Sequence, residues 1–227
     1  MDDALWQRST ARLRFLPPDP KLREMVLLFL AEKEFSGAHA LEVTDEMRVS
    51  IAAQACLPVL ELGLDWYRGW HGIVVYPGDF RVRRQEVDED GVVHEWEDDL
   101  AGEAMPGGPV VLSWDALAHD PAINVVIHEF AHKLDMLNGE ADGVPPLHAG
   151  MDWHAWRAVF DEAYEGFCDA VERGRDTWVD PYAAEHPSEF FAVISEAFFR
   201  EPRETRRRYP RVYEQLALFY RQDPAGR

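Results

Sequence analysis

The sequence contains few cysteines, no long apolar run and few basic residues relative to acidic ones. Only two of its 227 residues are cysteines, Cys56 and Cys168, and their spacing fits neither a zinc knuckle nor a redox motif, so no disulfide framework is expected. The longest strongly apolar run, residues 25–31, is far too short to cross a bilayer, and the first residues lack the basic start and apolar core of a signal peptide. These absences favour a cytoplasmic protein.

The shortage of basic residues limits the class of partner. Aspartate and glutamate number 42 against 23 lysines and arginines, which gives a formal net charge of −19. A surface of this charge repels polyanions, so neither nucleic acid nor an anionic membrane is expected as the main partner. The basic cluster within residues 203–211 is typical of a solvated helix face or linker. The acidic run at residues 95–99 is typical of a solvated edge or loop, because it lacks the spacing of a calcium loop.

Residues 124–135 contain the stretch His128-Glu129-Phe130-Ala131-His132, which is the His-Glu-x-x-His pattern of zinc peptidases. Histidines at positions i and i+4 of a helix point to the same side and can bind one ion together. Glu129 follows the first histidine, where its carboxylate can take a proton from a metal-bound water. The alternative is a pair of core histidines that hydrogen-bond to carboxylates. A metal ion satisfies the cost of burying these polar groups more directly.

Hydrophobic periodicity predicts an α+β fold with a small, mostly antiparallel sheet of about four strands, followed by an active-site helix and C-terminal helices. The helix that carries the histidines is apolar nearly all round, with Asp120 and Pro121 expected at its start and Asn138-Gly139 at its end. Thr44 is expected to cap the second of two N-terminal helices. The expected helices are residues 21–35, 45–62, 152–173, 187–199 and 210–220, and the expected strands are residues 72–76, 81–87, 92–96 and 110–114.

Composition predicts one main domain with an N-terminal arm. Residues 1–20 are polar, carry several arginines and end in Pro17-Pro18-Asp19-Pro20, which is a barrier to helix formation. No comparable linker follows, so residues 21–227 are predicted to form a single domain.

A catalytic zinc site needs a third protein ligand in addition to the two histidines. Glu189 and Glu196 stand out because they lie seven residues apart, on one face of an otherwise apolar helix. Glu189 is also in the first turn of that helix, where a carboxylate can simply favour the helix dipole. Glu196, and Asp135 on the face of the two histidines, are candidates for accepting a hydrogen bond from an imidazole N–H. The candidates for the third ligand are His148, Asp152, His154, Glu185, Glu189 and Glu196.

Residues 128–135, 180–184 and 187–199 together resemble the Mlc titration factor A family, which are bacterial zinc-dependent peptidases of the gluzincin type. The arrangement is also similar to the catalytic domain of anthrax lethal factor, where a tyrosine precedes the ligand glutamate by seven residues, as Tyr182 precedes Glu189 here. The resemblance implies a zincin-like metallopeptidase fold with one zinc ion per chain. It also implies that the ion is held by His128, His132 and Glu189, that Glu129 is the general base, and that Tyr182 faces the reacting carbonyl. Aromatic packing beside Pro181 is the alternative role for Tyr182.

The residues and the resemblance together predict metal-assisted hydrolysis of a peptide or protein substrate. The resemblance further implies aminopeptidase action linked to the regulation of sugar uptake, with a transcriptional repressor of the Mlc type as a partner. The alternative is a non-catalytic zinc-containing protein that binds a transcriptional regulator. The strand at residues 110–113 is the candidate edge for pairing with an extended peptide, since backbone pairing gives affinity with little sequence selectivity.

Overall fold

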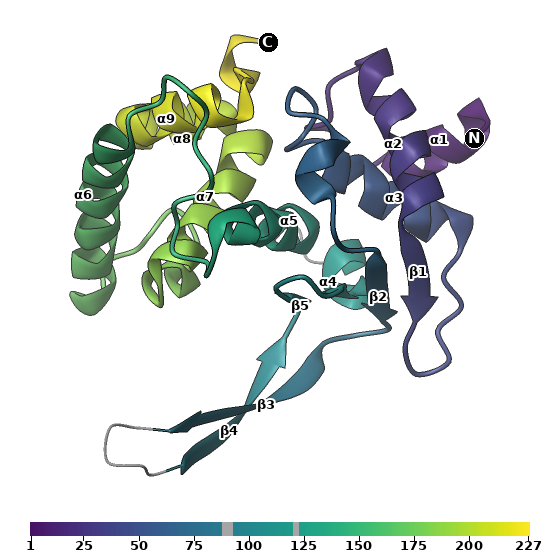
Figure 1. Cartoon of the computed structure of the whole chain (residues 1–227), viewed down its shortest axis with the longest axis horizontal. Coiled ribbons are helices and arrows are strands. Elements are labelled where there is room, and N and C mark those ends of the chain that lie inside the picture. Colours follow the sequence, from purple (N-terminus) through teal and green to yellow (C-terminus); the bar gives the residue numbers. More distant parts are fainter. Residues whose placement is uncertain (88–92, 120–122) are drawn as a thin grey trace.

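Helix α5 (Val125–Asp135) lies at the centre of the molecule, between an N-terminal half of helices and strands and a C-terminal group of helices (Figure 1). The structure is a computed structural model that describes residues 1–87, 93–119 and 123–227. Every residue of α5 is buried, because α7 packs against it from one direction and α3 and the sheet pack against it from others. Both histidines of the sequence motif are therefore inside the protein.

The two ends of α5 differ in how well the sequence predicted them. The expected first residues, Asp120 and Pro121, lie outside the described residues. The helix begins at Val125, where the Asn124 side-chain oxygen accepts a hydrogen bond from the Ile127 amide at 2.9 Å. At the other end a 3-10 turn, η2 (Met136–Asn138), leads to Gly139 with φ of 148°, which confirms the predicted stop.

Three helices precede the sheet: α1 (Asp3–Thr10), α2 (Pro20–Glu32) and α3 (Asp45–Cys56). Thr44 caps α3 as predicted and accepts a hydrogen bond from the Met47 amide at 3.3 Å. Helix α3 ends before the predicted residue 62, because Pro58 has no N–H with which to continue it. Helix α1 packs against α3 and an Arg8–Glu46 ion pair joins them. Residues 1–20 thus contain a helix, and the division of the chain at residue 20 stays a prediction.

The main sheet has four strands in the order β1 (Glu34–Gly37), β2 (Gly72–Tyr76), β6 (Val110–Ser113) and β5 (Gly102–Ala104). Strands β1, β2 and β6 run parallel, and β5 is antiparallel to β6. The α+β, zincin-like class is confirmed, but the prediction of mostly antiparallel pairing is wrong for this sheet. Between β1 and β2 the chain crosses over through α3, and between β2 and β6 it passes through a separate hairpin, so successive strands start from the same end. Alternation along a strand does not reveal its direction.

The predicted edge strand at residues 110–113 is not an edge. Strand β6 pairs with β2 on one side and with β5 on the other, and all four of its residues are buried. Such a run of apolar residues is typical of a strand covered on both faces. Within the described residues, the open edge of the sheet that faces α5 is β5.

The predicted hairpin is present as β3 (Phe80–Val87) and β4 (Val93–Leu100). Its antiparallel register runs from Phe80 opposite Leu100 to Val87 opposite Val93, while the predicted turn at residues 88–91 lies outside the described residues. Figure 1 shows the hairpin projecting away from the helices. It forms a separate two-stranded sheet whose second strand leads directly into β5.

The C-terminal helices enclose α5 with an aromatic core. They are α6 (Trp153–Glu172), α7 (Pro187–Arg200), α8 (Pro202–Arg208) and α9 (Pro210–Tyr220), and a short helix α4 (Trp114–His119) precedes α5. Trp156 stacks on Phe160, with ring centroids 4.3 Å apart, and Phe191 and Phe219 pack around Trp156. Phe191 belongs to α7, so this packing helps to set where α7 begins and where Glu189 in its first turn lies.

The arginines near the C-terminus lie at the surface, as the sequence predicted. Arg207 and Arg208 of the basic cluster are exposed and pair with Glu204, as expected for a solvated helix face. None of the helices in the described parts of the chain combines the length and the apolarity needed to cross a bilayer.

Candidate metal centre

Helix α5 places the two histidines of the motif next to each other. The Nε2 atoms of His128 and His132 are 3.1 Å apart, and their ring centroids are separated by 4.8 Å. This is the geometry that i, i+4 spacing on a helix predicts. Both nitrogens point to the same side of α5, towards the start of helix α7.

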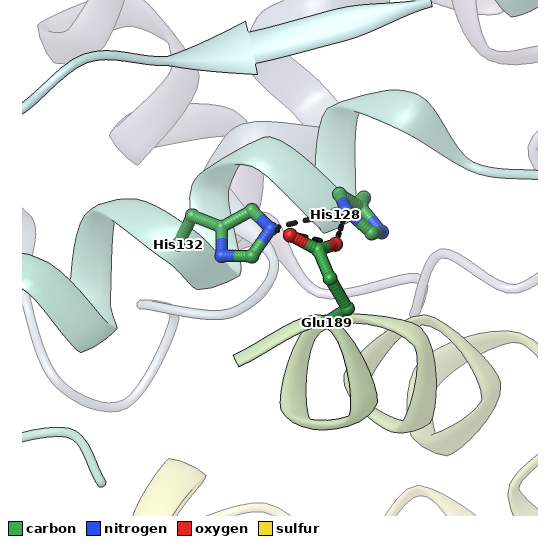
Figure 2. Close-up of side chains that lie close together, drawn as sticks. All are labelled: His128, His132 and Glu189. Carbon is green, nitrogen blue, oxygen red and sulfur yellow. Dashed lines mark hydrogen bonds and ion pairs between the residues drawn. The ribbon is translucent and has the colours of Figure 1, made fainter. Parts of the chain in front are cut away.

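Glu189 completes the cluster from the first turn of α7 (Figure 2). Its Oε2 atom lies 3.0 Å from His128 Nε2 and 3.2 Å from His132 Nε2. The three side chains keep only 11%, 9% and 18% of their surface exposed, respectively for His128, His132 and Glu189. Two imidazole nitrogens and one carboxylate oxygen thus converge on one point in a largely buried site, and this group could hold a metal ion.

The charges in this cluster depend on one another. Burial lowers the pKa of His128, but hydrogen bonds to Glu189 and Glu196 outweigh burial and hold that pKa well above its usual value. Burial raises the pKa of Glu189, but the two histidines more than offset this and hold it well below its usual range. Without a metal, a protonated His128 beside a charged Glu189 is therefore favoured. The same negative environment suits a bound cation.

Glu129 lies one residue from His128 and faces a cavity of about 490 Å³ that is also lined by His128, Tyr182 and Glu196. Burial raises the pKa of Glu129, with smaller raising contributions from Glu189 and Glu103, and the two histidines oppose the shift. A carboxylate with a raised pKa holds a proton more readily than an exposed one, which suits a group that both accepts and donates protons beside a metal cluster.

Tyr182 lies at the same cavity, on the 3-10 turn η3 (Pro181–Ala184) that precedes α7. Asp180 caps this turn by accepting a hydrogen bond from the Tyr182 amide at 2.9 Å. The Tyr182 side chain is 40% exposed, and its ring lies 6.4 Å from the His128 ring. Tyr182 therefore lines the cavity beside His128, and its role stays a prediction.

Glu196 contacts both His128 and the start of α5. Its Oε1 atom is 2.9 Å from His128 Nδ1, and its Oε2 atom accepts a hydrogen bond from the Asn124 amide at 2.6 Å. Arg200, one turn further along α7, lies 4.0 Å from the same carboxylate. Glu196 is therefore positioned to orient His128, as the sequence predicted for an acceptor of an imidazole N–H.

Asp135 lies on the same helix as His132 and is fully buried. Its Oδ2 atom accepts a hydrogen bond from the Gly143 amide at 2.8 Å, but its Oδ1 atom has no partner in the structure, and neither has the buried Nδ1 atom of His132. Burial is the main reason that the pKa of Asp135 rises to about 7. An unpaired donor and an unpaired acceptor three residues apart on one helix face are a second feature that fits a metal-bound histidine, whose free nitrogen carries a proton.

The structure separates Glu189 and Glu196 from the other candidates for the third ligand. His148 hydrogen-bonds to the Phe219 carbonyl at 2.7 Å, and Asp152 caps α6 through the His154 amide. His154 packs its ring against Trp153, and Glu185 is an exposed residue after η3. These four residues lie outside the cluster.

Sequence reasoning missed one residue of the site, Gly102 in strand β5. A Cβ atom built at Gly102 would lie 2.5 Å from Glu129 Oε1 and 2.5 Å from Val125 Cγ2, so only glycine allows the strand to lie this close to the helix. The available signal was an isolated glycine beside a strand pattern, which often marks a close approach of two backbones. A strand of three residues is too short for periodicity to identify.

Known proteins with similar sequences identify the family of this chain. A family model described as glucose-regulated metallo-peptidase M90 matches residues 2–221. Mlc titration factor A of Yersinia pestis (strain Pestoides F) is 36% identical over 217 residues, which cover 93% of this chain and 80% of that protein, and the Yersinia pseudotuberculosis protein of the same name gives the same values. An uncharacterized protein of Synechocystis sp. is 40% identical over 211 residues, or 90% of this chain and 76% of its own length. The chain belongs to the glucose-regulated metallo-peptidase M90 family.

Proposed function

We propose that this protein is a zinc-dependent peptidase that holds one zinc ion with His128, His132 and Glu189. The observation that carries the proposal is the convergence of two imidazole nitrogens and one carboxylate oxygen beside the cavity that Glu129 faces. Two histidines and one glutamate are a ligand set used by catalytic zinc sites, which keep a further position open for water or substrate. Magnesium and calcium prefer sites made of oxygen ligands, so this donor set favours zinc.

The bound zinc ion would supply Lewis acidity and lower the pKa of a water molecule in the cavity. Glu129 would accept a proton from that water as it attacks the scissile carbonyl, and would then deliver the proton to the leaving amine. Tyr182 would donate a hydrogen bond from its hydroxyl to the developing oxyanion, a contribution on the order of a few kcal/mol if well placed. The positions of Glu129 and Tyr182 on one cavity support these roles.

Two further carboxylates would hold the histidines in place. Glu196 accepts from His128 Nδ1, and we assign Asp135 the same role for His132, through one bridging water. Such hydrogen bonds fix which ring nitrogen is free to bind the metal and raise its basicity. Both carboxylates therefore act on the metal through the histidines and not on the substrate.

Strand β5 is our candidate for binding the substrate backbone. On either side of β5, the Ser113 amide donates a hydrogen bond to the Ala101 carbonyl, and the Met105 amide donates one to the carbonyl of Pro109, just before β6. Paired residues in an antiparallel ladder alternate between bonded and non-bonded pairs. The backbone groups of Gly102 and Ala104 therefore point away from β6, towards the open edge. An extended peptide paired there would lie along α5, next to Glu129.

The substitution Glu129→Gln tests the catalytic part of the proposal. It removes the base but keeps the size of the side chain, so zinc content and melting temperature are expected to stay at wild-type values while peptide hydrolysis is lost. A peptide-library digest with this variant as control would report activity, side-chain preference and whether residues are released from the N-terminus. Cleavage that persists in Glu129→Gln would refute the assignment of the base.

A second candidate function is binding of a transcriptional repressor of the Mlc type, alone or together with peptidase action. The observation that favours it is the name Mlc titration factor A of relatives that are 36% identical to this chain. Purified repressor mixed with wild-type and Glu129→Gln protein should co-elute with both if binding is independent of catalysis. Separate elution in both cases would refute this second function and leave the peptidase proposal intact.

A further inference from the structure

Lys133 lies on the same face of α5 as Glu129, one turn further on, and its ammonium group is buried. The residue is 4% exposed. Its Nζ atom donates hydrogen bonds to the carbonyls of Met105 at 2.6 Å and Gly108 at 2.7 Å. Both carbonyls belong to the turn that joins β5 to β6. The active-site helix is thus connected directly to the far end of the edge strand.

An ammonium group in this position is costly to bury, so its contacts need a reason. Burial, with a further contribution from the charge of Lys33, lowers the pKa of Lys133 to about 8. The Trp70 ring lies 4.6 Å from the ammonium, and an apolar side chain would pack against that ring without the cost of burying a charge. What an apolar side chain could not do is hold the Met105 and Gly108 carbonyls.

The other end of β5 is held against the same helix face. Gly102 lies directly over Val125 and Glu129, at a separation that excludes even a methyl group. Val125, Glu129 and Lys133 are spaced i, i+4 and i+8, so they form one stripe along α5. Strand β5 lies along this stripe, with glycine contact at its start and the lysine hydrogen bonds at its end.

We propose that Lys133 is a positioning residue that sets the distance between the open edge of β5 and the metal centre. The inference rests on the proposed peptidase function and on the assignment of β5 as the strand that binds substrate backbone. Without the two hydrogen bonds from Lys133, the β5–β6 turn can move away from α5, and the outward backbone groups of Gly102 and Ala104 move with it. Long peptides that pair with the edge of β5 lose this contact, whereas short peptides that never reach the edge are unaffected.

The test is the dependence of kcat/KM on peptide length in Lys133→Met. A nested series of peptides extended on both sides of one cleaved bond should show a rise of kcat/KM with length in the wild-type protein. In Lys133→Met this rise should shrink about tenfold, mainly through KM, which corresponds to the loss of one or two backbone hydrogen bonds. Lys133→Arg keeps donors for both carbonyls and should recover most of the rise.

Lys33 provides the matched control. Its ammonium is also buried against Trp70, 4.3 Å from the ring, but it donates to the carbonyls of Tyr67 and Trp70 and not to the β5–β6 turn. Lys33→Met should therefore lose stability in the same way while keeping the wild-type rise with length. An unchanged rise in Lys133→Met, or an equal loss in Lys33→Met, would overturn the inference.

A second measurement separates this inference from the proposed function. In zinc-loaded Glu129→Gln protein, which does not turn over, the same peptides should bind more tightly as they become longer. Adding Lys133→Met should weaken this gain in affinity with length, and adding Lys133→Arg should restore most of it. If the wild-type protein cleaves no peptide but Lys133 still controls length-dependent binding, the peptidase proposal fails and the positioning role stands. If peptides are cleaved but neither binding nor cleavage depends on Lys133, the positioning role fails alone.

Discussion

The close approach of Gly102 to Glu129 leads to a prediction for Gly102→Ala. The new Cβ atom would lie 2.5 Å from Glu129 Oε1 and 2.7 Å from Glu129 Cγ, whereas ordinary van der Waals contact begins at 3.4 Å. Because the Cβ atom would also lie 2.5 Å from Val125 Cγ2, either β5 or the side chains of Glu129 and Val125 together must move by about 1 Å. Both β5 and Glu129 carry part of the proposed reaction. Displacements of this size cost roughly a hundredfold in rate when they misplace a reacting group.

The stability effect of the same substitution is smaller and can be measured independently. Overpacking of a buried contact typically costs about 1–3 kcal/mol, so the melting temperature should fall while zinc content stays at one equivalent, because Gly102 touches no proposed ligand. Gly166→Ala is the matched control: its added Cβ atom meets nothing within 4 Å, and alanine is the better helix former by roughly 1 kcal/mol. Activity of Gly102→Ala within a factor of about three of the wild type would refute the argument from close approach.

Four further predictions follow from the carboxylates and the histidines. Asp135→Asn should weaken zinc binding about tenfold to a hundredfold in a chelator competition. Asp142→Asn in the adjacent loop is the control and should bind zinc as the wild type does. Equal affinities for Asp135→Asn and the wild type would show that Asp135 does not support the metal site. Glu196→Gln should lower the unfolding free energy of the metal-free protein by about 1–3 kcal/mol, because the carboxamide cannot accept from both His128 and the Asn124 amide; an unchanged melting curve would contradict this. Because the pKa of His128 is raised in the metal-free protein, zinc must displace a proton, and affinity should rise by up to roughly tenfold per pH unit until the pH exceeds that pKa. The raised pKa of His128 also stabilises the metal-free protein: this stabilisation is complete below the pKa of an unfolded histidine and is lost as the pH rises through the folded pKa. The melting temperature of the metal-free protein should therefore fall as the pH rises across this range. A constant melting temperature, or a zinc affinity that does not depend on pH, would contradict the reasoning.

Much of the candidate metal site could be predicted from residues that are close together in the sequence. The spacing of His128 and His132 determines that both imidazoles face one side once the segment is helical, and the apolar residues around them determine that this helix is buried. Pro187 fixes the start of α7 and so places Glu189 in its first turn. These features depend on neighbours in sequence, which is why periodicity and capping residues predict them.

Contacts between distant segments decided what periodicity left open. Glu189 became the third member of the cluster because α7 packs against α5, a contact across some sixty positions that no local pattern contains. Strand directions in the sheet depend on where the crossovers run. The parallel pairing of β2 with β6 and the unpaired edge at β5 could therefore not be predicted from the sequence. The same holds for Gly102 in the edge strand and for the backbone amide of Asn124, whose contacts exist only because Glu129 and Glu196 lie against them.

The sequence by itself therefore determined the chemistry of the ligands and the helices that carry them. Only the tertiary structure decided how Glu189 reaches the histidines and which strand borders the cavity, because the meeting of two elements depends on the path of the whole chain and not on neighbours in sequence.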